Sequence, residues 1–490
     1  ASDVYKRQEE ALAWIEDSLK TDAFNFGCLF EKYLITRNET VLIQLRNLMK
    51  RGAPDYEALV LDYTSAGRFE EALAVAELAI AQPVGEQTLL HYYKSWCLIR
   101  LGKTAEAQIA IATAEKEPAD YCFPNALEAI EALQCVVDFA GKAPKALYYL
   151  GNLWYDKRRY PTAIAAWERS SREDETFPTV WRNLSLAYFN KMNRPDEAVT
   201  LLEKAFRLDH TDARVLMELD QLYKRLNRPH IERLCFLEQH IDIVMTRDDL
   251  YLEYVTLLNQ TGQYREAIRR IDQRKFHPWE GGEGKVPAQY QLARLELAKE
   301  LINRKKYDDA LALIDECYIY PTHLGEGKLP GAQENDFNYY KAYILQQQGR
   351  PEEAHSLFVK ACSGNSQPAA AMYYNDQKPD KIFYQGLAYR KLGEEEKARS
   401  RFNQLITYGE EHLFDRFKMD YFAVSLPDLL IWEDDMDKKN RIHCNYLMAL
   451  GHLGLGNRTK AEHFFDIAAS MDNNHQGVQI HRKLMNTILS

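Results

Sequence analysis

The chain has 490 residues, of which 46% are hydrophobic and 27% charged, and its formal net charge is -10. This composition excludes a disordered chain, and no apolar run approaches the roughly 20 residues that a membrane-spanning helix needs. An acidic chain repels phosphate backbones, which disfavours a nucleic-acid partner. A single core rarely grows to this length, so several domains or a repeat array are expected.

The amino terminus differs from the rest of the chain. Residues 3–8 read Asp-Val-Tyr-Lys-Arg-Gln, which is the translation of a DNA adapter used in preparing sequencing libraries. We therefore expect residues 1–8 to be an adapter-derived artefact and the native protein to continue upstream. Residues 9–56 follow as a helical lead-in, because apolar residues recur with helical spacing around Trp14 and again within residues 42–49.

A helix–turn–helix pattern recurs along the remaining chain. Each occurrence has a small residue, then an aromatic one, a turn, and an alanine that opens a second helix, as in Gly151, Trp154, Tyr160 and Ala163. The opening positions are Ala72, Ala107, Ala163, Ala198, Glu232, Ala267, Ala310, Ala354, Ala398 and Ala461. A period of about 34 residues is that of the tetratricopeptide unit. The sequence therefore predicts an all-α tetratricopeptide-repeat (TPR) α-solenoid, a right-handed superhelix of about ten units.

The predicted array has two parts. Residues 57–275 form a regular array with an extra helix near residues 119–146. From residue 276 to residue 490 the steps between units lengthen, because loops are inserted between the second helix of one unit and the first helix of the next. Insertions at equivalent places in a solenoid project from the same face, which is often the binding face.

Two of the inserted loops contain the best candidates for a binding site. They share the string Gly-Glu-Gly-Lys, ending at Lys285 and at Lys328, one unit apart. An aromatic side chain beside carboxylates suits a sugar ring, whose C–H face stacks while its hydroxyls donate hydrogen bonds. The alternative is that the glycines shape the loops and that Glu–Lys pairs bridge them. The candidate binding residues are His277, Trp279, Glu280, Glu283, Lys285, His323, Glu326, Lys328, Glu334 and Asp336.

Other chemistry has little support in the sequence. The Gly-Glu-Gly-Lys strings lack the spacing of a phosphate loop, and no zinc spacing occurs, so we predict no cofactor and no metal. The acidic run 433–437 has carboxylates that could bind calcium, but such a run is more often a solvated loop or a helix start. The eight cysteines form no C-x-x-C pair, which indicates thiols in a reducing compartment and favours a cytoplasmic location. We predict no catalytic residue and no enzymatic activity.

Several motifs resemble one protein family. They are His277–Lys285, Leu324–Lys328 with residues 333–336, Asp420–Asp428, Tyr149–Asp156 and Asn474–Gly477. Together they resemble the carboxy-terminal half of a bacterial family in which a β-rich domain of unknown function, similar to the galactose-mutarotase sandwich, precedes a tetratricopeptide array. The resemblance spans residues 9–490 and implies that the β-rich domain is missing here. It also implies a carbohydrate context.

Two hypotheses for function follow. The first is a non-enzymatic scaffold whose concave surface binds a protein, a peptide or the missing amino-terminal domain. The second is the accessory half of a carbohydrate-binding or carbohydrate-active protein, in which the loops of residues 276–336 contribute to a sugar site. The first is favoured because the repeat pattern is a much stronger signal than the loop residues.

Overall fold

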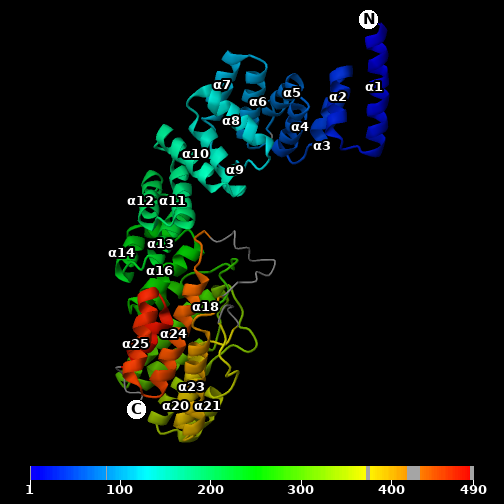
Figure 1. Ribbon diagram of the computed structural model, residues 1–490. Coiled ribbons are helices and arrows are strands. Elements are labelled where there is room, and N and C mark those ends of the chain that lie inside the picture. Colours follow the sequence, from blue (N-terminus) through cyan, green and yellow to red (C-terminus); the bar gives the residue numbers. More distant parts are fainter. Residues whose placement is uncertain (1, 84, 371–375, 417–430, 486–490) are drawn as a thin grey trace. The chain divides into compact units, whose positions relative to one another are not determined.

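A computed structural model of the chain describes residues 2–83, 85–370, 376–416 and 431–485 (Figure 1). Within these ranges all regular elements are helices, and successive long helices pack against each other as hairpins. None of the described helices is both long enough and apolar enough to cross a bilayer. The chain divides into two compact units, Ala1–Leu208 (unit 1) and Asp209–Ser490 (unit 2).

Unit 1 begins with a long helix that includes the residues assigned to the adapter, and its repeats follow. Its helices are α1 Ser2–Thr21, α2 Phe26–Thr36, α3 Glu39–Leu48, α4 Ala53–Ser65, α5 Phe69–Ile80, α6 Thr88–Arg100, α7 Thr104–Ala114, α8 Glu128–Ala140, α9 Pro144–Asp156, α10 Tyr160–Glu173, α11 Pro178–Met192 and α12 Pro195–Leu208.

Unit 2 contains the repeats that carry inserted loops. Its helices are α13 Ala213–Arg225, α14 His230–Gln239, α15 Ile241–Val244, α16 Asp248–Gln260, α17 Tyr264–Asp272, α18 Lys285–Asn303, α19 Tyr307–Cys317, the 3-10 turn Thr322–Leu324, α20 Asn335–Gln347, α21 Pro351–Ala361, α22 Pro379–Lys391, α23 Glu395–His412, α24 Met436–Gly454, α25 Arg458–Met471 and α26 Gln476–Leu484.

The hairpins share one internal register. The fourth residue of each second helix is buried, and in nine hairpins it is alanine, as at Ala72 in α5 and Ala461 in α25. A second buried residue lies twelve or thirteen positions earlier on the first helix. These earlier residues are Val60, Ser95, Gly151, Ser185, Val255, Ala298, Ala342, Gly386 and Ala449. Glycine, alanine, serine or valine at these positions lets the two helices of a hairpin approach closely.

The α13–α14 hairpin departs from this register and corrects one sequence assignment. Glu232 is exposed, and the fourth residue of α14 is Arg233, which is only 1% exposed. The matching position on α13 is Asp220, which is fully buried. The assignment of Glu232 was therefore wrong by one residue, because the turn between α13 and α14 is one residue longer than in most hairpins. A buried ion pair here replaces the small residues of the other hairpins.

Candidate functional site

The two inserted loops that contain the predicted site lie side by side. The backbone N–H of Phe276 donates to the carbonyl oxygen of His323 at 2.8 Å, and the N–H of Gly284 donates to Oε2 of Glu326 at 2.7 Å. Gly325 has a φ of +77°, and a Cβ placed there would lie 2.7 Å from the carbonyl oxygen of Phe276. Glycine is therefore required at position 325 for the loops to come this close.

These loops enclose a small cavity of about 270 Å³. Five of the predicted residues line it, namely His277, Trp279, Glu280, Glu283 and Glu326. The Trp279 ring lies directly against Gly282, since a Cβ there would lie 2.3 Å from the ring. Burial raises the pKa of Glu326, the Gly284 N–H lowers it, and repulsion from Glu283 raises it further. The cavity thus combines one aromatic wall with three carboxyl groups, which accept hydrogen bonds.

The other five predicted residues do not line this cavity. His323 directs its Nε2 toward Asp272, 3.8 Å away. Lys328 pairs with Glu334, and it also donates to the carbonyl oxygen of Tyr318 at 3.0 Å. Asp336 pairs with Lys381.

Lys285 belongs to a different surface. Desolvation by the surrounding protein lowers its pKa, and repulsion from Lys224 on α13 lowers it further. Among the described residues, no three His, Cys, Asp or Glu side chains converge as metal ligands would.

Unit 1 carries an open apolar groove between α6 and α8, with a volume of about 730 Å³. One face of α8 is buried and apolar, with Ala132, Leu133 and Val136 in the core. Ile130, Cys135 and Phe139 flank this face, pack partly against the same core, and recur at helical spacing along the groove. The residues that line the groove are Ile99 on α6 and Leu127, Ile130, Glu131, Gln134, Cys135, Asp138 and Phe139.

Exposed apolar side chains continue from this groove along the chain. Leu127 is 64% exposed, and the preceding segment presents Phe123 at 75% and Tyr121 at 85% exposure. Contiguous exposed apolar surface on a soluble chain marks an interaction site more often than single exposed residues do. The groove is also lined by two acids, Glu131 and Asp138.

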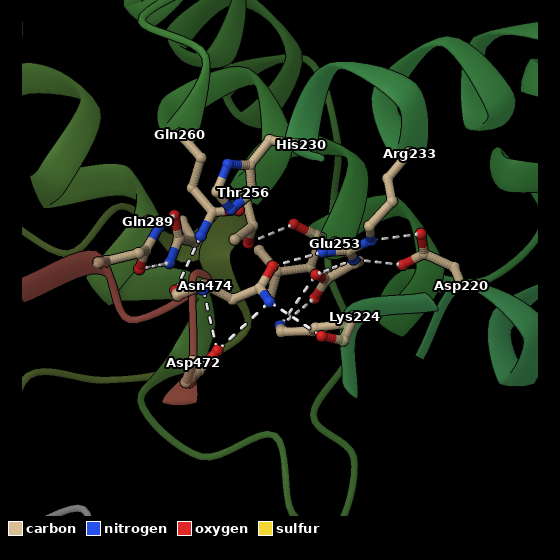
Figure 2. A network of polar contacts seen from close by, with 12 residues as sticks. Asp220, Lys224, His230, Arg233, Glu253, Thr256, Gln260, Gln289, Asp472 and Asn474 are labelled. Carbon is tan, nitrogen blue, oxygen red and sulfur yellow. Dashed lines mark hydrogen bonds and ion pairs between the residues drawn. The ribbon is translucent and has the colours of Figure 1, made fainter. Parts of the chain in front are cut away.

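Unit 2 has a polar network centred on Arg233 (Figure 2). Its Nε and Nη2 donate to the two carboxylate oxygens of Asp220 at 3.0 and 2.7 Å, and Nη2 also donates to Glu253 at 2.7 Å. Lys224 donates to both oxygens of Glu253 at 2.9 and 3.0 Å. Burial raises the pKa of Glu253, but Lys224 and Arg233 together lower it to about 2. The carboxylate is thus held in its charged form.

The same arginine contacts a residue far along the chain. Its Nη1 donates to Oδ1 of Asn474 at 2.7 Å, although the two residues are 241 positions apart. Asn474 in turn donates from Nδ2 to the carbonyl oxygen of Lys224 at 3.0 Å, and its own carbonyl oxygen accepts from Gln260 at 2.8 Å (Figure 2). The turn before α26 is therefore fixed to α13, α14 and α16.

This network does not show in the sequence pattern. Residues 474–477 contribute there only to a family resemblance, and a register set on Glu232 gives Arg233 no part in the repeat. The available signal was an arginine at the position that is alanine in nine other hairpins. Two further residues, Asp220 and Glu253, carry no local signal, because isolated acids on first helices are common in this chain.

Comparisons with known proteins identify the repeats. Family models for the tetratricopeptide repeat match residues 123–179 and residues 382–408. The chain therefore contains tetratricopeptide repeats, and its all-helical structure is that of a TPR α-solenoid.

Three solved structures illustrate the similarity. The TPR domain of P58(IPK) is 13% identical, with 90% of this chain and 98% of that chain covered and a TM-score of 0.26. MamA from Desulfovibrio magneticus RS-1 is 16% identical over 39% of this chain and 95% of that one, with a TM-score of 0.24. The C-terminal part of a TPR repeat-containing protein from Cytophaga hutchinsonii is 15% identical over 65% and 100%, with a TM-score of 0.23.

Proposed function

We propose that the chain is a non-enzymatic scaffold that binds an amphipathic helix of a partner protein in the α6–α8 groove. The observation that carries the proposal is the groove of about 730 Å³ along α8, whose apolar lining residues are only partly buried and continue into the exposed Leu127. Tetratricopeptide repeats generally mediate protein–protein interactions, which agrees with a scaffold role. A helix laid in such a groove places residues at i, i+3, i+4 and i+7 against it.

The charges that line the groove indicate which kind of partner helix it binds. Glu131 and Asp138 line it, and the chain as a whole is acidic. Arg100 contacts Glu131 at 3.2 Å, so an arginine already occupies part of this acidic lining. A partner helix with lysine or arginine beside its apolar stripe complements the remaining charge, and such complementarity favours the correct partner and faster association.

A display library of amphipathic helical peptides, selected on the full chain, tests this proposal. The selected peptides should carry an apolar stripe flanked by basic residues. Ile130→Glu should weaken their binding at least about ten-fold, which corresponds to about 1.4 kcal/mol. The matched control is Ile109→Glu, because Ile109 is an exposed isoleucine on α7 that does not line the groove. Peptides whose affinity is the same for both variants would refute the groove as the binding site.

The loop cavity supports a second function, the binding of a carbohydrate. Its aromatic wall, Trp279, and its three acceptor carboxylates match what a hexose presents, an apolar C–H face and several hydroxyl donors. In the family that these loops resemble, the same surface would complete a site of the preceding β-rich domain or clamp that domain. This parent architecture and its carbohydrate-active role are part of the same proposal.

Calorimetry with glucose, galactose and their disaccharides tests the second function. Binding should occur with the unmodified chain and be lost in the Trp279→Ala/Glu283→Gln variant. Trp14→Ala removes a tryptophan that is 79% exposed elsewhere and should leave binding unchanged. If none of these sugars binds, or if the double variant binds as well as the unmodified chain, this function is rejected.

A further inference from the structure

Residues 471–485 (the C-terminal segment) pack on helices from the whole length of unit 2. Besides Asn474, the segment places Gln476 against Gln289 of α18, where the two amides exchange hydrogen bonds at 2.8 and 3.0 Å. Lys483 donates to the Tyr264 hydroxyl of α17 at 3.0 Å. The surface that receives the segment (the docking face) consists of Lys224, Asn227, Arg233, Gln260, Tyr264, Gln289, Phe383, Tyr384 and Tyr446.

The turn at the start of the segment is bound as a ligand would be. Asn473 and Asn227 form a reciprocal pair, in which Nδ2 of Asn473 donates to the Asn227 carbonyl oxygen at 2.8 Å and the Asn473 N–H donates to Oδ1 of Asn227 at 3.1 Å. Together with the contacts of Asn474, these bonds satisfy backbone and side-chain groups of the turn. Directed hydrogen bonds of this kind add specificity for sequence to the apolar burial of Val478 and Leu484 in the core of unit 2.

The helix of the segment is seated by close contact. A Cβ at Gly477 would lie 2.6 Å from the Tyr446 hydroxyl, so only glycine allows this approach to α24. His481 lies among the rings of Phe383, Tyr384 and Tyr446, and the Tyr446 hydroxyl lies 3.0 Å from its Nδ1. The helix has only nine residues, which is too short to be stable alone in water. Its conformation therefore depends on the docking face.

The Asp220–Arg233 pair connects these contacts to the repeat. Nine other hairpins close with alanine at the position of Arg233, so a charged pair is not needed to pack the hairpin. A buried ion pair is weak support for stability and is better attested as a device for specificity. Here Nη1 of Arg233 donates to Asn474, so the ion pair also binds a residue outside its own hairpin.

We propose that unit 2 carries a peptide-binding face whose resident ligand is the chain's own C-terminal segment, held at its turn by Arg233. The same face binds a second copy of the segment when the resident one is absent. Tethering gives the resident segment an effective concentration in the millimolar range, so it outcompetes a free peptide of equal affinity.

A labelled peptide of residues 470–485 tests this in trans by fluorescence anisotropy. The full chain carrying Asn474→Ala and Gly477→Ala has a resident segment that cannot seat, while its docking face is unchanged. This variant should bind the peptide at least ten-fold more tightly than the unmodified chain does. The matched control peptide carries Gly477→Ala, which favours the helix but clashes with Tyr446, and it should bind at least ten-fold more weakly.

Failure of the peptide to bind a folded double variant would overturn the proposal, because the segment would then be part of the unit 2 core. If the double variant does not fold, hydrogen exchange of the unmodified chain in increasing denaturant decides the matter. Opening of residues 476–484 before α24 supports a docked ligand, and opening of both together overturns it.

Discussion

The α11–α12 and α13–α14 hairpins have the same length between their paired positions but opposite chemistry there. In the first, the Ser185 hydroxyl donates to the carbonyl oxygen of Ala198 at 2.6 Å, and both residues are fully buried. In the second, Asp220 and Arg233 form a two-pronged ion pair with equal burial. The first contact involves only its own hairpin, whereas the second also contacts α16 and the turn before α26.

This difference separates two requirements on a repeat. Close packing of the two helices needs only small side chains, and serine with alanine provides it. A buried charge costs desolvation energy that a single partner rarely repays, so it persists where several partners converge. Arg233 has three such partners, Asp220, Glu253 and Asn474. The repeat pattern therefore marks where the array is regular, and the departure from it marks where a distant segment is held.

Arg233→Ala should have the largest effect on unit 2. It leaves Asp220 buried without its cation, and breaking a buried pair from one side typically costs about 3–5 kcal/mol. Urea unfolding followed by circular dichroism measures the loss. The double variant Asp220→Ser/Arg233→Ala gives the α13–α14 hairpin the serine and alanine of the α11–α12 hairpin. It should recover most of the lost free energy of unfolding. Equal destabilisation of the single and double variants would show that the charges themselves stabilise the hairpin.

Acidification should release the C-terminal segment. Burial lowers the pKa of His481 to about 4. The folded state therefore favours the neutral ring. The stability that the neutral ring contributes is fully present above the ordinary histidine pKa of about 6.5, and it is lost as the pH falls from there toward 4. At pH 5 the loss in the free energy of unfolding is about 2 kcal/mol, since each pH unit below the ordinary pKa costs about 1.4 kcal/mol.

Hydrogen exchange of residues 476–484 at pH 7 and pH 5, corrected for intrinsic rates, measures this release. His481→Gln should reduce the pH dependence of this exchange. Part of the dependence should remain, because burial also lowers the pKa of His443 to about 4. His355→Gln, at an exposed position on α21, is the control. A pH dependence unaltered by His481→Gln would contradict the assignment.

The close approach of the two inserted loops can be tested by adding a Cβ where they meet. Gly325→Ala places a Cβ 2.7 Å from the Phe276 carbonyl oxygen in a left-handed backbone conformation, and such strain costs about 1–3 kcal/mol. Gly327→Ala, two residues further on, meets nothing within 4 Å and should change stability much less. Thermal unfolding of the two variants compares them directly. Equal transition temperatures would mean that the loops do not meet as described.

The smallest expected effect is in the hairpin with small residues. Ser185→Ala removes one hydrogen bond to the carbonyl oxygen of Ala198 but leaves no buried charge, so it should cost about 1 kcal/mol or less. Urea unfolding of unit 1 helices, monitored by hydrogen exchange, measures it. A cost as large as that of Arg233→Ala would remove the contrast between the two hairpins.

The repeats were predictable because their chemistry is local. Alanine is the fourth residue of the second helix in nine hairpins, so the pattern within each hairpin stays readable even where inserted segments lengthen the steps between units. The adjacency of the inserted loops also followed from the register, since Gly284 and Glu326 lie about one unit apart and do contact each other.

The orientation of side chains in the loops was not predictable in the same way. Lys285 is the first residue of α18 and Asp336 the second of α20, so the helix directions, not the loop spacing, decide where they point. The contact between Arg233 and Asn474 depends on the curvature of the whole of unit 2. Periodicity within one repeat contains no information on that curvature.

The role of Arg233 in holding the C-terminal segment is best tested by hydrogen exchange on the 490-residue chain carrying Asp220→Ser/Arg233→Ala. Amides of residues 476–484 should exchange at least ten-fold faster than in the unmodified chain, while those of α24 and of the α13–α14 hairpin keep their protection. Unchanged protection of residues 476–484 would show that the ion pair does not hold the segment.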